Sequence, residues 1–255
     1  MGHVVFIGAG PGAADLITLR GAARLAQADV VLYDALTDPA LRKLAPKARW
    51  LHVGKRGFCD STAQTTINAL MVKHALEVDV VVRLKGGDPS VFGRLEEELD
   101  ALTRAGIACE VVPGVTAAIA AAADTQRPLT RRGTLGPAGR SVSLTTAVTR
   151  NGALPALRHA DTEVFYMAGK QLGALSRRLR SAGWSNDTPA SVVSRAGCSD
   201  MRYSDHTLLT LAQASMLHAG RPTVVTVGAG ACALTTHAQS HTTDNLASPM
   251  ETLKS

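Results

Sequence analysis

Aromatic residues and cysteines are scarce in this chain of 255 residues. Phe, Trp and Tyr together make up only 4% of the sequence, which argues against a protein that binds single-stranded nucleic acid by stacking bases on aromatic side chains. The four cysteines are scattered, without a CxxC pair and without histidines at zinc-finger spacing. We therefore expect free thiols, a reducing compartment and no metal site.

Long apolar runs are also missing. The longest, around residues 115–123, is shorter than the roughly 20 residues that a membrane-spanning helix needs. The N-terminus enters a strand-like run at once, with neither the basic segment nor the apolar stretch of a signal peptide. These absences predict a cytoplasmic protein with no membrane partner and no nucleic-acid partner.

Positive charge is in excess. The chain has 27 Lys+Arg against 21 Asp+Glu, a net charge of +6, and 20 of the 27 basic residues are arginines. Arginine binds carboxylates and phosphates through its planar pair of donors, so an acidic ligand is one explanation. A solvated basic surface is the other, and net charge alone does not separate the two. With 45% hydrophobic and 19% charged residues, the composition is that of a folded globular protein.

The pattern of the first half predicts a parallel sheet with crossover helices. Short β-branched runs alternate there with longer helical patterns. The expected strands are residues 4–7, 30–33, 51–53, 80–84 and 109–112, and the expected helices are 15–28, 37–45, 62–77 and 93–105.

The second half predicts another, smaller α/β unit. Its expected strands are 142–145, 163–167, 190–193 and 223–227, with a helix over 170–182. An alanine-rich stretch near 114–120 separates the halves, so the sequence predicts domains over 1–116 and 117–233. The polar segment 234–255 is expected to be a disordered tail.

Polar or glycine-rich residues follow each strand of the first half. GAGPG at 8–12 comes first, then Asp34, Gly54-Lys55, residues 85–89 and Pro113-Gly114. The carboxyl ends of parallel strands share one edge of a sheet, where ligands bind. These five segments are therefore expected to meet at one cleft.

The glycine loop leaves two interpretations open. Read as GxGxxA and ending at Ala13, it matches the dinucleotide fingerprint, with Asp34 as the ribose-binding acid of an NAD-linked oxidoreductase. It can equally be a tight turn that lets a ligand approach the backbone.

The string VVVRLKGGDPSVFGRLEEELDAL at 80–102 is more specific. Together with GAGPGAADLITLRGAARLAQADVVLYD, VGKRG, VVPGVTAA and PLTRR, it resembles the uroporphyrinogen-III C-methyltransferases of the tetrapyrrole methylase superfamily, over residues 4–230. The resemblance implies two α/β domains, a homodimer, and S-adenosylmethionine folded into the cleft between the domains. It also implies methylation of two pyrrole carbons of uroporphyrinogen III, giving precorrin-2 for sirohaem, cobalamin or haem d1 and two S-adenosylhomocysteines.

The resemblance also assigns roles to individual residues. Acid and base candidates are Asp34 and Lys55, and the base stays open between these two and Glu97. Cofactor contacts are expected at Pro11, Gly86, Gly87, Asp88, Val91, Thr116, Ala117, Met167 and Ala196. Substrate-handling residues are expected at Arg94, Glu97 and Arg132. Because the tetrapyrrole carries eight carboxylates, the expected arginine partners are Arg94, Arg127, Arg131, Arg132 and Arg140.

The sequence departs from the family pattern at Leu95-Glu96, at Arg131 and at residues 145–147. Two further hypotheses of the same class stay open. One is a methylase of a later corrin precursor, which would share the cofactor site. The other is a homologue that binds the cofactor with little activity.

Overall fold

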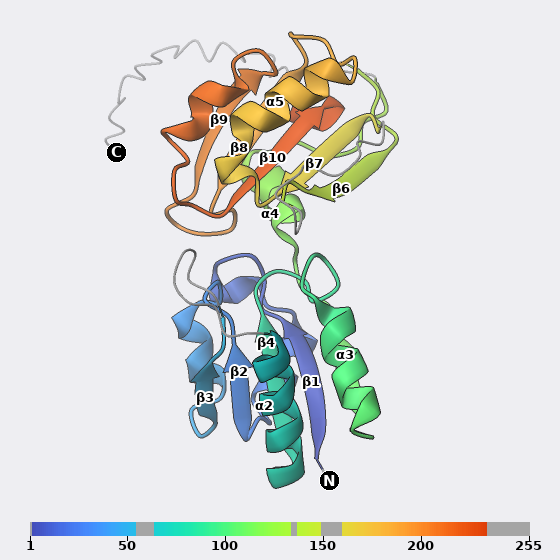
Figure 1. Ribbon diagram of the computed structural model, residues 1–255. Coiled ribbons are helices and arrows are strands. Elements are labelled where there is room, and N and C mark those ends of the chain that lie inside the picture. Colours follow the sequence, from blue (N-terminus) through green and yellow to red (C-terminus); the bar gives the residue numbers. More distant parts are fainter. Residues whose placement is uncertain (1, 55–63, 134–136, 149–159, 234–255) are drawn as a thin grey trace, which may run out of the picture.

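The computed structural model describes residues 2–54, 64–133, 137–148 and 160–233. Two five-stranded sheets, each flanked by helices, lie in the two halves of the chain (Figure 1). This confirms the predicted α/β fold class.

The first sheet is wholly parallel and has the order β3-β2-β4-β1-β5. Each of its strands includes residues of a predicted run. The strands are β1 (His3–Gly8), β2 (Val30–Tyr33), β3 (Arg49–His52), β4 (Val80–Lys85) and β5 (Cys109–Val112).

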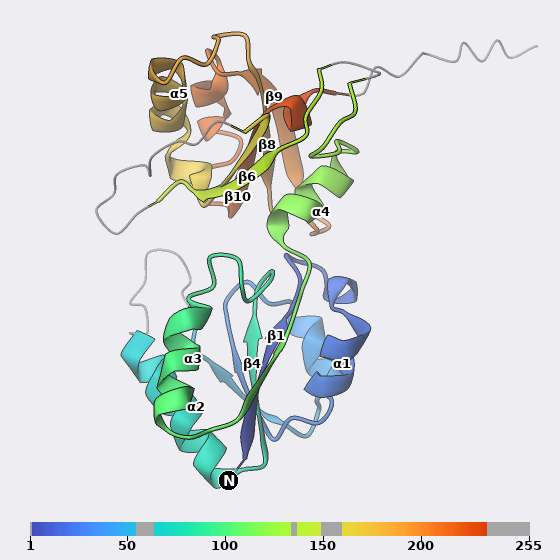
Figure 2. The same cartoon turned by 90° about the vertical axis from the view of Figure 1, so that its right-hand side faces the viewer.

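Helices cover both faces of this sheet (Figure 2). Side chains alternate between faces along a strand, so Val4 and Phe6 pack toward α2 (Gln64–Glu77) and α3 (Leu95–Arg104). Val5 and Ile7 pack on the other side, toward α1 (Leu19–Leu25) and the 3-10 helix η2 (Pro39–Leu44).

Two expected helices differ from the prediction. The segment 15–28 divides into the short 3-10 helix η1 (Ala14–Leu16) and α1, because Ile17 and Thr18 are extended and the Thr18 hydroxyl caps α1 by accepting from the Gly21 amide at 3.0 Å. The segment 37–45 forms η2 rather than an α-helix.

The second sheet is mixed and has the order β6-β7-β10-β8-β9. Its elements are β6 (Val142–Thr146), β7 (Thr162–Tyr166), the 3-10 helix η3 (Ala168–Lys170), α5 (Leu172–Ser181), β8 (Pro189–Ser194), β9 (Arg202–Thr207), the 3-10 helix η4 (Leu211–Ser215), β10 (Thr223–Gly228) and the 3-10 helix η5 (Ala229–Ala231). The sequence reading missed β9, an antiparallel edge strand that pairs with β8.

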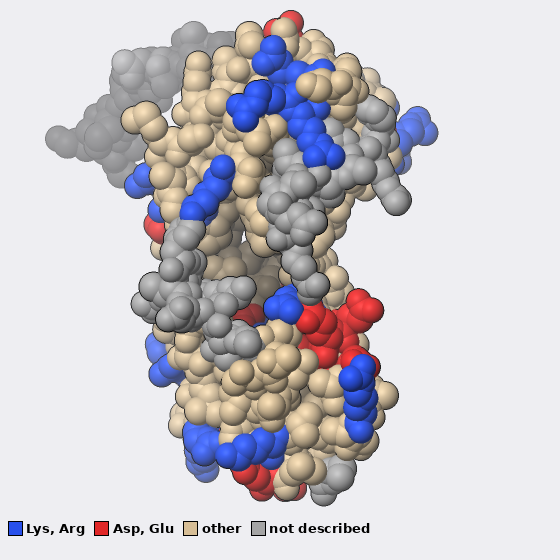
Figure 3. All heavy atoms as spheres, viewed as in Figure 1, with Lys and Arg blue, Asp and Glu red and all other residues tan. Residues whose placement is uncertain are grey.

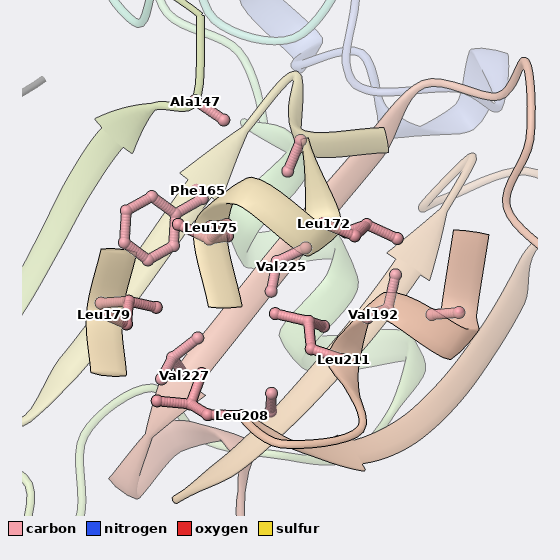
Figure 4. Packing of buried hydrophobic residues seen from close by; sticks show 13 residues of the cluster. Ala147, Phe165, Leu172, Leu175, Leu179, Val192, Leu208, Leu211, Val225 and Val227 are labelled. Atoms are coloured by element: carbon pink, nitrogen blue, oxygen red, sulfur yellow. The ribbon is translucent and has the colours of Figure 1, made fainter. Parts of the chain in front are cut away.

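A hydrophobic core lies between this sheet and the helices on its outer face. Phe165, Leu175, Leu179 and Val225 are fully buried there, and their side chains meet between α5 and the sheet (Figure 4). The helix α4 (Ala117–Asp124) follows β5 and packs on the inner side of the second sheet, where Ala118 contacts Val164 and Tyr166. The connection from β5 to α4 therefore crosses from one half to the other.

Candidate active site

A cavity lies between the two halves of the described chain. It encloses about 950 Å³ and is lined by the loops after β1, β2 and β4 together with residues of the second sheet and its loops. The space-filling view shows the molecule hollowed at this level (Figure 3). Its volume is that of a small-molecule site.

The cavity lies where the topology predicts a ligand. The connection from β1 leads to β2 on one side of the β1–β4 pair, and the connection from β4 leads to β5 on the other. Such a reversal opens a crevice at the carboxyl ends of the two strands. The segments after β1, β2 and β4 line this crevice, and Gly114 after β5 packs against Gly8 and Gly87. Gly54 packs against Asp34, and its predicted neighbour Lys55 lies outside the described residues.

Glycine backbones hold the loops after β1, β4 and β5 together at this crevice. The amide of Gly87 donates to the carbonyl of Gly10 at 2.7 Å, and the amide of Gly10 returns a bond of 3.3 Å. Both residues have positive φ, +78° at Gly10 and +75° at Gly87, which side chains with a Cβ rarely adopt. A Cβ on Gly114 would lie 2.4 Å from the Gly87 carbonyl oxygen, so the loops pack at a distance that only glycine permits.

Asp88 connects these loops through hydrogen bonds of its carboxylate. One carboxylate oxygen accepts from the Ser90 amide and the other from the Gly114 amide, both at 2.8 Å. The carboxylate thus joins the loop after β4 to the linker after β5. Its bonds explain why an acid follows the glycine pair.

All nine residues predicted to bind the cofactor line this one cavity. Seven come from the first half and the linker, and Met167 and Ala196 come from the second half. Met167 adopts a left-handed conformation with φ of 56° directly after β7, and its side chain is half exposed. The structure therefore brings together residues that are up to 185 positions apart in the sequence.

Tyr166 is a lining residue that the sequence analysis missed. Its hydroxyl lies 2.8 Å from the Thr116 hydroxyl and accepts from the Ala118 amide at 3.3 Å. Burial raises the pKa of the phenol, against the lowering effect of these two hydrogen bonds. The ring of Phe92 packs on it with centroids 5.0 Å apart. Tyr166 thus joins the second sheet to the linker and to the loop after β4.

Asp34 lies on the cavity wall, and its position is fixed by an ion pair with a buried arginine. Its carboxylate accepts from Arg83 at 2.7 Å, and about a quarter of its side chain is exposed. Arg83 in turn donates to Glu98 at 3.0 Å, and Lys85 donates to the other oxygen of Glu98 at 2.5 Å. We call Arg83, Lys85, Glu98 and Asp34 the buried charge network.

The network places two cations and two carboxylates beneath the cavity. Arg83 and Lys85 lie on the same face of β4, and Glu98 on α3 is fully buried. Burial and the nearby Arg83 lower the pKa of Lys85, although Glu98 opposes them. For Arg83, burial acts downward, but the attraction of Asp34 and Glu98 prevails and raises its pKa.

The other predicted site residues lie elsewhere. Arg94 and Glu97, at the start of α3, pair with each other through bonds of 2.7 and 2.6 Å and do not line the cavity. Arg132 lies with Arg131 and Arg140 at a second, more open hollow in the other half. Lys55 lies outside the described residues.

Arg127 does not fit the expected role of a carboxylate-binding arginine. Its side chain is buried, donates to both oxygens of Asp205 and bonds Ser191 at 3.0 Å. Its donors are thus engaged in anchoring the segment after α4 to β8 and β9.

The dinucleotide interpretation does not fit the topology. In the usual dinucleotide-binding order, β1 lies beside β2 and the glycine loop opens directly into a helix. Here β4 separates β1 from β2, and α1 begins only at Leu19. Asp34, the expected ribose-binding acid, is bonded to Arg83.

Comparisons with known proteins agree with this geometry. The family model for tetrapyrrole (corrin/porphyrin) methylases matches residues 3–212. The chain is similar to a uroporphyrinogen-III C-methyltransferase of Pseudomonas aeruginosa, at 42% identity over 205 residues, which cover 79% of this chain and 82% of that protein. A crystal structure of uroporphyrin-III C-methyltransferase from Thermus thermophilus complexed with S-adenosylhomocysteine superposes with a TM-score of 0.77 and 35% identity, covering 89% of this chain and 97% of that one.

A siroheme synthase of Neisseria meningitidis is also similar, at 42% identity over 234 residues. The match covers 89% of this chain but 48% of the synthase, so the chain spans about half the length of that relative. Among the described residues, none of the helices has both the length and the apolarity to cross a membrane.

Proposed function

The chain belongs to the family of tetrapyrrole (corrin/porphyrin) methylases, and we propose that it methylates two pyrrole carbons of uroporphyrinogen III. S-Adenosylmethionine is the methyl donor, and the products are precorrin-2 and two molecules of S-adenosylhomocysteine. The observation that carries the proposal is the gathering of all nine expected cofactor residues in one cavity.

The cavity wall suits such a cofactor. S-Adenosylmethionine brings an electrophilic methyl group on a sulfonium, together with an adenine, a ribose and an amino-acid moiety. A Cβ on Gly87 would meet no atom within 4 Å, so the backbone here leaves room for a ligand to approach closely. Gly86, Gly87, Thr116 and Ala117 would hold it with backbone groups, with Met167 and Ala196 on the opposite side. The protein's task is then to align donor and acceptor and to exclude water.

Asp34 is the residue we assign as proton acceptor. Methylation of a pyrrole carbon leaves a cationic ring that must lose a proton, and a positioned base assists this. Asp34 faces the cavity and is fixed by Arg83. Glu97 is paired with Arg94 and lies off the cavity lining. We keep Lys55 as the proton donor candidate, and Arg94, Glu97 and Arg132 as substrate-handling residues.

We also propose the organisation of the whole molecule. Domains over 1–116 and 117–233 are supported by the two separate sheets and by the packing of α4 on the second. We propose a homodimer, as the family resemblance implies, and a cytoplasmic location, as the scattered cysteines and the N-terminal sequence indicate.

Purified protein, S-adenosylmethionine and uroporphyrinogen III, incubated without oxygen, test the proposal. We expect the absorbance of precorrin-2 to appear with two methyl groups transferred per acceptor. Absence of methyl transfer despite S-adenosylhomocysteine binding would instead favour the homologue with little activity. A panel of corrin precursors as acceptors separates uroporphyrinogen III from a later substrate.

Calorimetry checks the cofactor class independently. We expect S-adenosylhomocysteine to bind, and NAD and NADP not to bind. Tight binding of either dinucleotide would overturn the assignment.

A further inference from the structure

Four side chains that contact one another form part of the lining of the cavity between the halves. Tyr33 ends β2, Trp50 and His52 lie on β3, and Arg42 lies on η2. We call these residues the Arg42 shelf. None of them is among the residues expected to bind the cofactor or to carry the chemistry.

Strand register explains why these side chains meet. Tyr33 pairs with His52 and Val31 pairs with Trp50 in the parallel β2–β3 ladder, so Tyr33, Trp50 and His52 point to the same face. The 3-10 helix η2 covers that face, and the Trp50 indole donates to the Ala45 carbonyl at its end at 3.0 Å. The Tyr33 ring lies edge-on to Trp50 at 5.6 Å and to His52 at 5.2 Å.

The guanidinium of Arg42 is held by this aromatic surface. It lies 5.2 Å from the centroid of Tyr33 and 5.6 Å from that of Trp50, and it donates to the Tyr33 hydroxyl at 2.6 Å. Cation–π contacts of this kind fix a guanidinium without neutralising it. Because these contacts already order the Arg42 side chain, it loses less conformational entropy when a ligand binds.

Arg42 differs from the other cations near the cavity in the partners of its guanidinium. Arg195 also lines the cavity, but its Nε is 2.7 Å from the Asp200 carboxylate. Arg83, beneath the cavity, is paired with Asp34 and Glu98. Within the described ranges, no carboxylate lies within 4.0 Å of Arg42. A fixed cation in a cavity wall with only neutral partners is suited to an anionic ligand.

We propose that Arg42 binds a carboxylate arm of the methyl acceptor, with Trp50 and Tyr33 packing against the pyrrole ring that carries the arm. The inference rests on the proposed function and extends it with a specificity residue. The shelf lies on β2, β3 and η2, whereas the residues expected to bind the cofactor follow β1, β4 and β5 or come from the second half. In this proposal the side of the cavity at β2 and β3 is the acceptor lobe, and the rest is the cofactor lobe.

Arg42 lends itself to a clean test because its side chain is exposed on a short helix. Arg42→Ala removes the fork and the charge, Arg42→Lys keeps the charge alone, and Lys43→Ala is the matched control on the same helix, since Lys43 is exposed and does not line the cavity. All variants are made in a Trp184→Phe background, which leaves Trp50 as the single tryptophan.

We expect Arg42→Ala to raise the KM for uroporphyrinogen III about tenfold, equivalent to about 1.4 kcal/mol. The kcat should stay within about twofold, because a peripheral carboxylate is bound equally in the ground and transition states. Arg42→Lys should fall between, and Lys43→Ala should match the parent. The affinity for S-adenosylhomocysteine, measured by calorimetry, should be the same in all four proteins.

A binding measurement separates this inference from the proposed function. Uroporphyrin, which has the same carboxylate arms and cannot be methylated in the same way, should quench Trp50 fluorescence in the parent and bind about tenfold more weakly to Arg42→Ala. If the parent methylates uroporphyrinogen III and Arg42→Ala has an unchanged KM and uroporphyrin affinity, only the shelf is refuted. A loss of S-adenosylhomocysteine affinity would also refute it, by placing Arg42 in the cofactor lobe. A parent that binds S-adenosylhomocysteine but neither methylates uroporphyrinogen III nor binds uroporphyrin contradicts both.

Discussion

Replacing Glu98 by Gln is expected to destabilise the first half of the molecule strongly. Glu98 is fully buried and accepts from Arg83 at 3.0 Å and from Lys85 at 2.5 Å. The substitution keeps the shape of the side chain but removes its charge. Arg83 then keeps the Asp34 carboxylate and the carbonyls of Leu32 and Leu84, and Lys85 loses the carboxylate that it contacts.

The size of the effect follows from opposing contributions. Each ion pair at about 4 Å is worth about 4 kcal/mol at an effective permittivity of about 20, so two lost pairs amount to about 8 kcal/mol. Removing the buried carboxylate also removes its desolvation penalty, which is several kcal/mol. The expected net loss is about 3–5 kcal/mol, a large fraction of the stability of an ordinary domain.

The pH dependence has a defined sign. Burial and Arg83 already lower the pKa of Lys85, and loss of Glu98 lowers it further. The unfolded chain then binds more protons than the folded one in the window below 10.5, the ordinary pKa of lysine. The stability of the Glu98→Gln variant should therefore rise with pH within this window.

The assay is urea unfolding followed by Trp50 fluorescence in the Trp184→Phe background, which reports on the first sheet. Glu97→Gln is the matched control: the same change, one position earlier in α3, at an ion pair with Arg94 whose side chains are 45% and 44% exposed. An exposed pair is worth about 0–1 kcal/mol. If both variants lower the free energy of unfolding equally, the reasoning about the buried charge network is wrong.

Three further results are expected. Burial lowers the pKa of His218 to about 4 from 6.5. Because the unfolded chain takes up the proton first, stability followed by Trp184 fluorescence should fall by up to about 3 kcal/mol as the pH drops from 6.5 to 4, and His218→Gln should flatten the profile. Gly114→Ala places a Cβ 2.4 Å from the Gly87 carbonyl oxygen and should weaken S-adenosylhomocysteine at least tenfold by calorimetry; Gly173→Ala, with its nearest contact at 3.6 Å, should not. Arg132→Ala should weaken tetrapyrrole binding and leave S-adenosylhomocysteine affinity nearly unchanged; parallel losses of both affinities would contradict this division.

The strands of the first sheet were predictable because the residues that favour each strand and its ends are neighbours in the sequence. Buried parallel strands read as continuous β-branched runs, and turn residues mark their ends. The convergence of the strand-end loops followed from topology alone, so the cofactor lobe was accessible from the sequence once the family resemblance was recognised.

Other features depend on partners that are distant in the sequence. The edge strand β9, RYSDHT, is mostly polar and lacks the apolar run of a buried strand. Arg83 and Lys85 two positions apart in an apolar run were a signal of the buried charge network, but their partner on α3 appears only in the fold. The same holds for Arg127, whose basic neighbourhood suggested a ligand and whose actual partner is Asp205.

The linker between the halves is itself part of the binding surface. Gly114 is bonded to Asp88, and Thr116 and Ala117 line the cavity, so the short path from β5 to α4 both connects the halves and forms part of the cavity wall. Inserting even one residue here would displace cavity-lining groups, and separating the halves would leave each with an incomplete site. Evolution can lengthen the loops elsewhere in such a protein, but this connection is constrained in length by the ligand as well as by the fold.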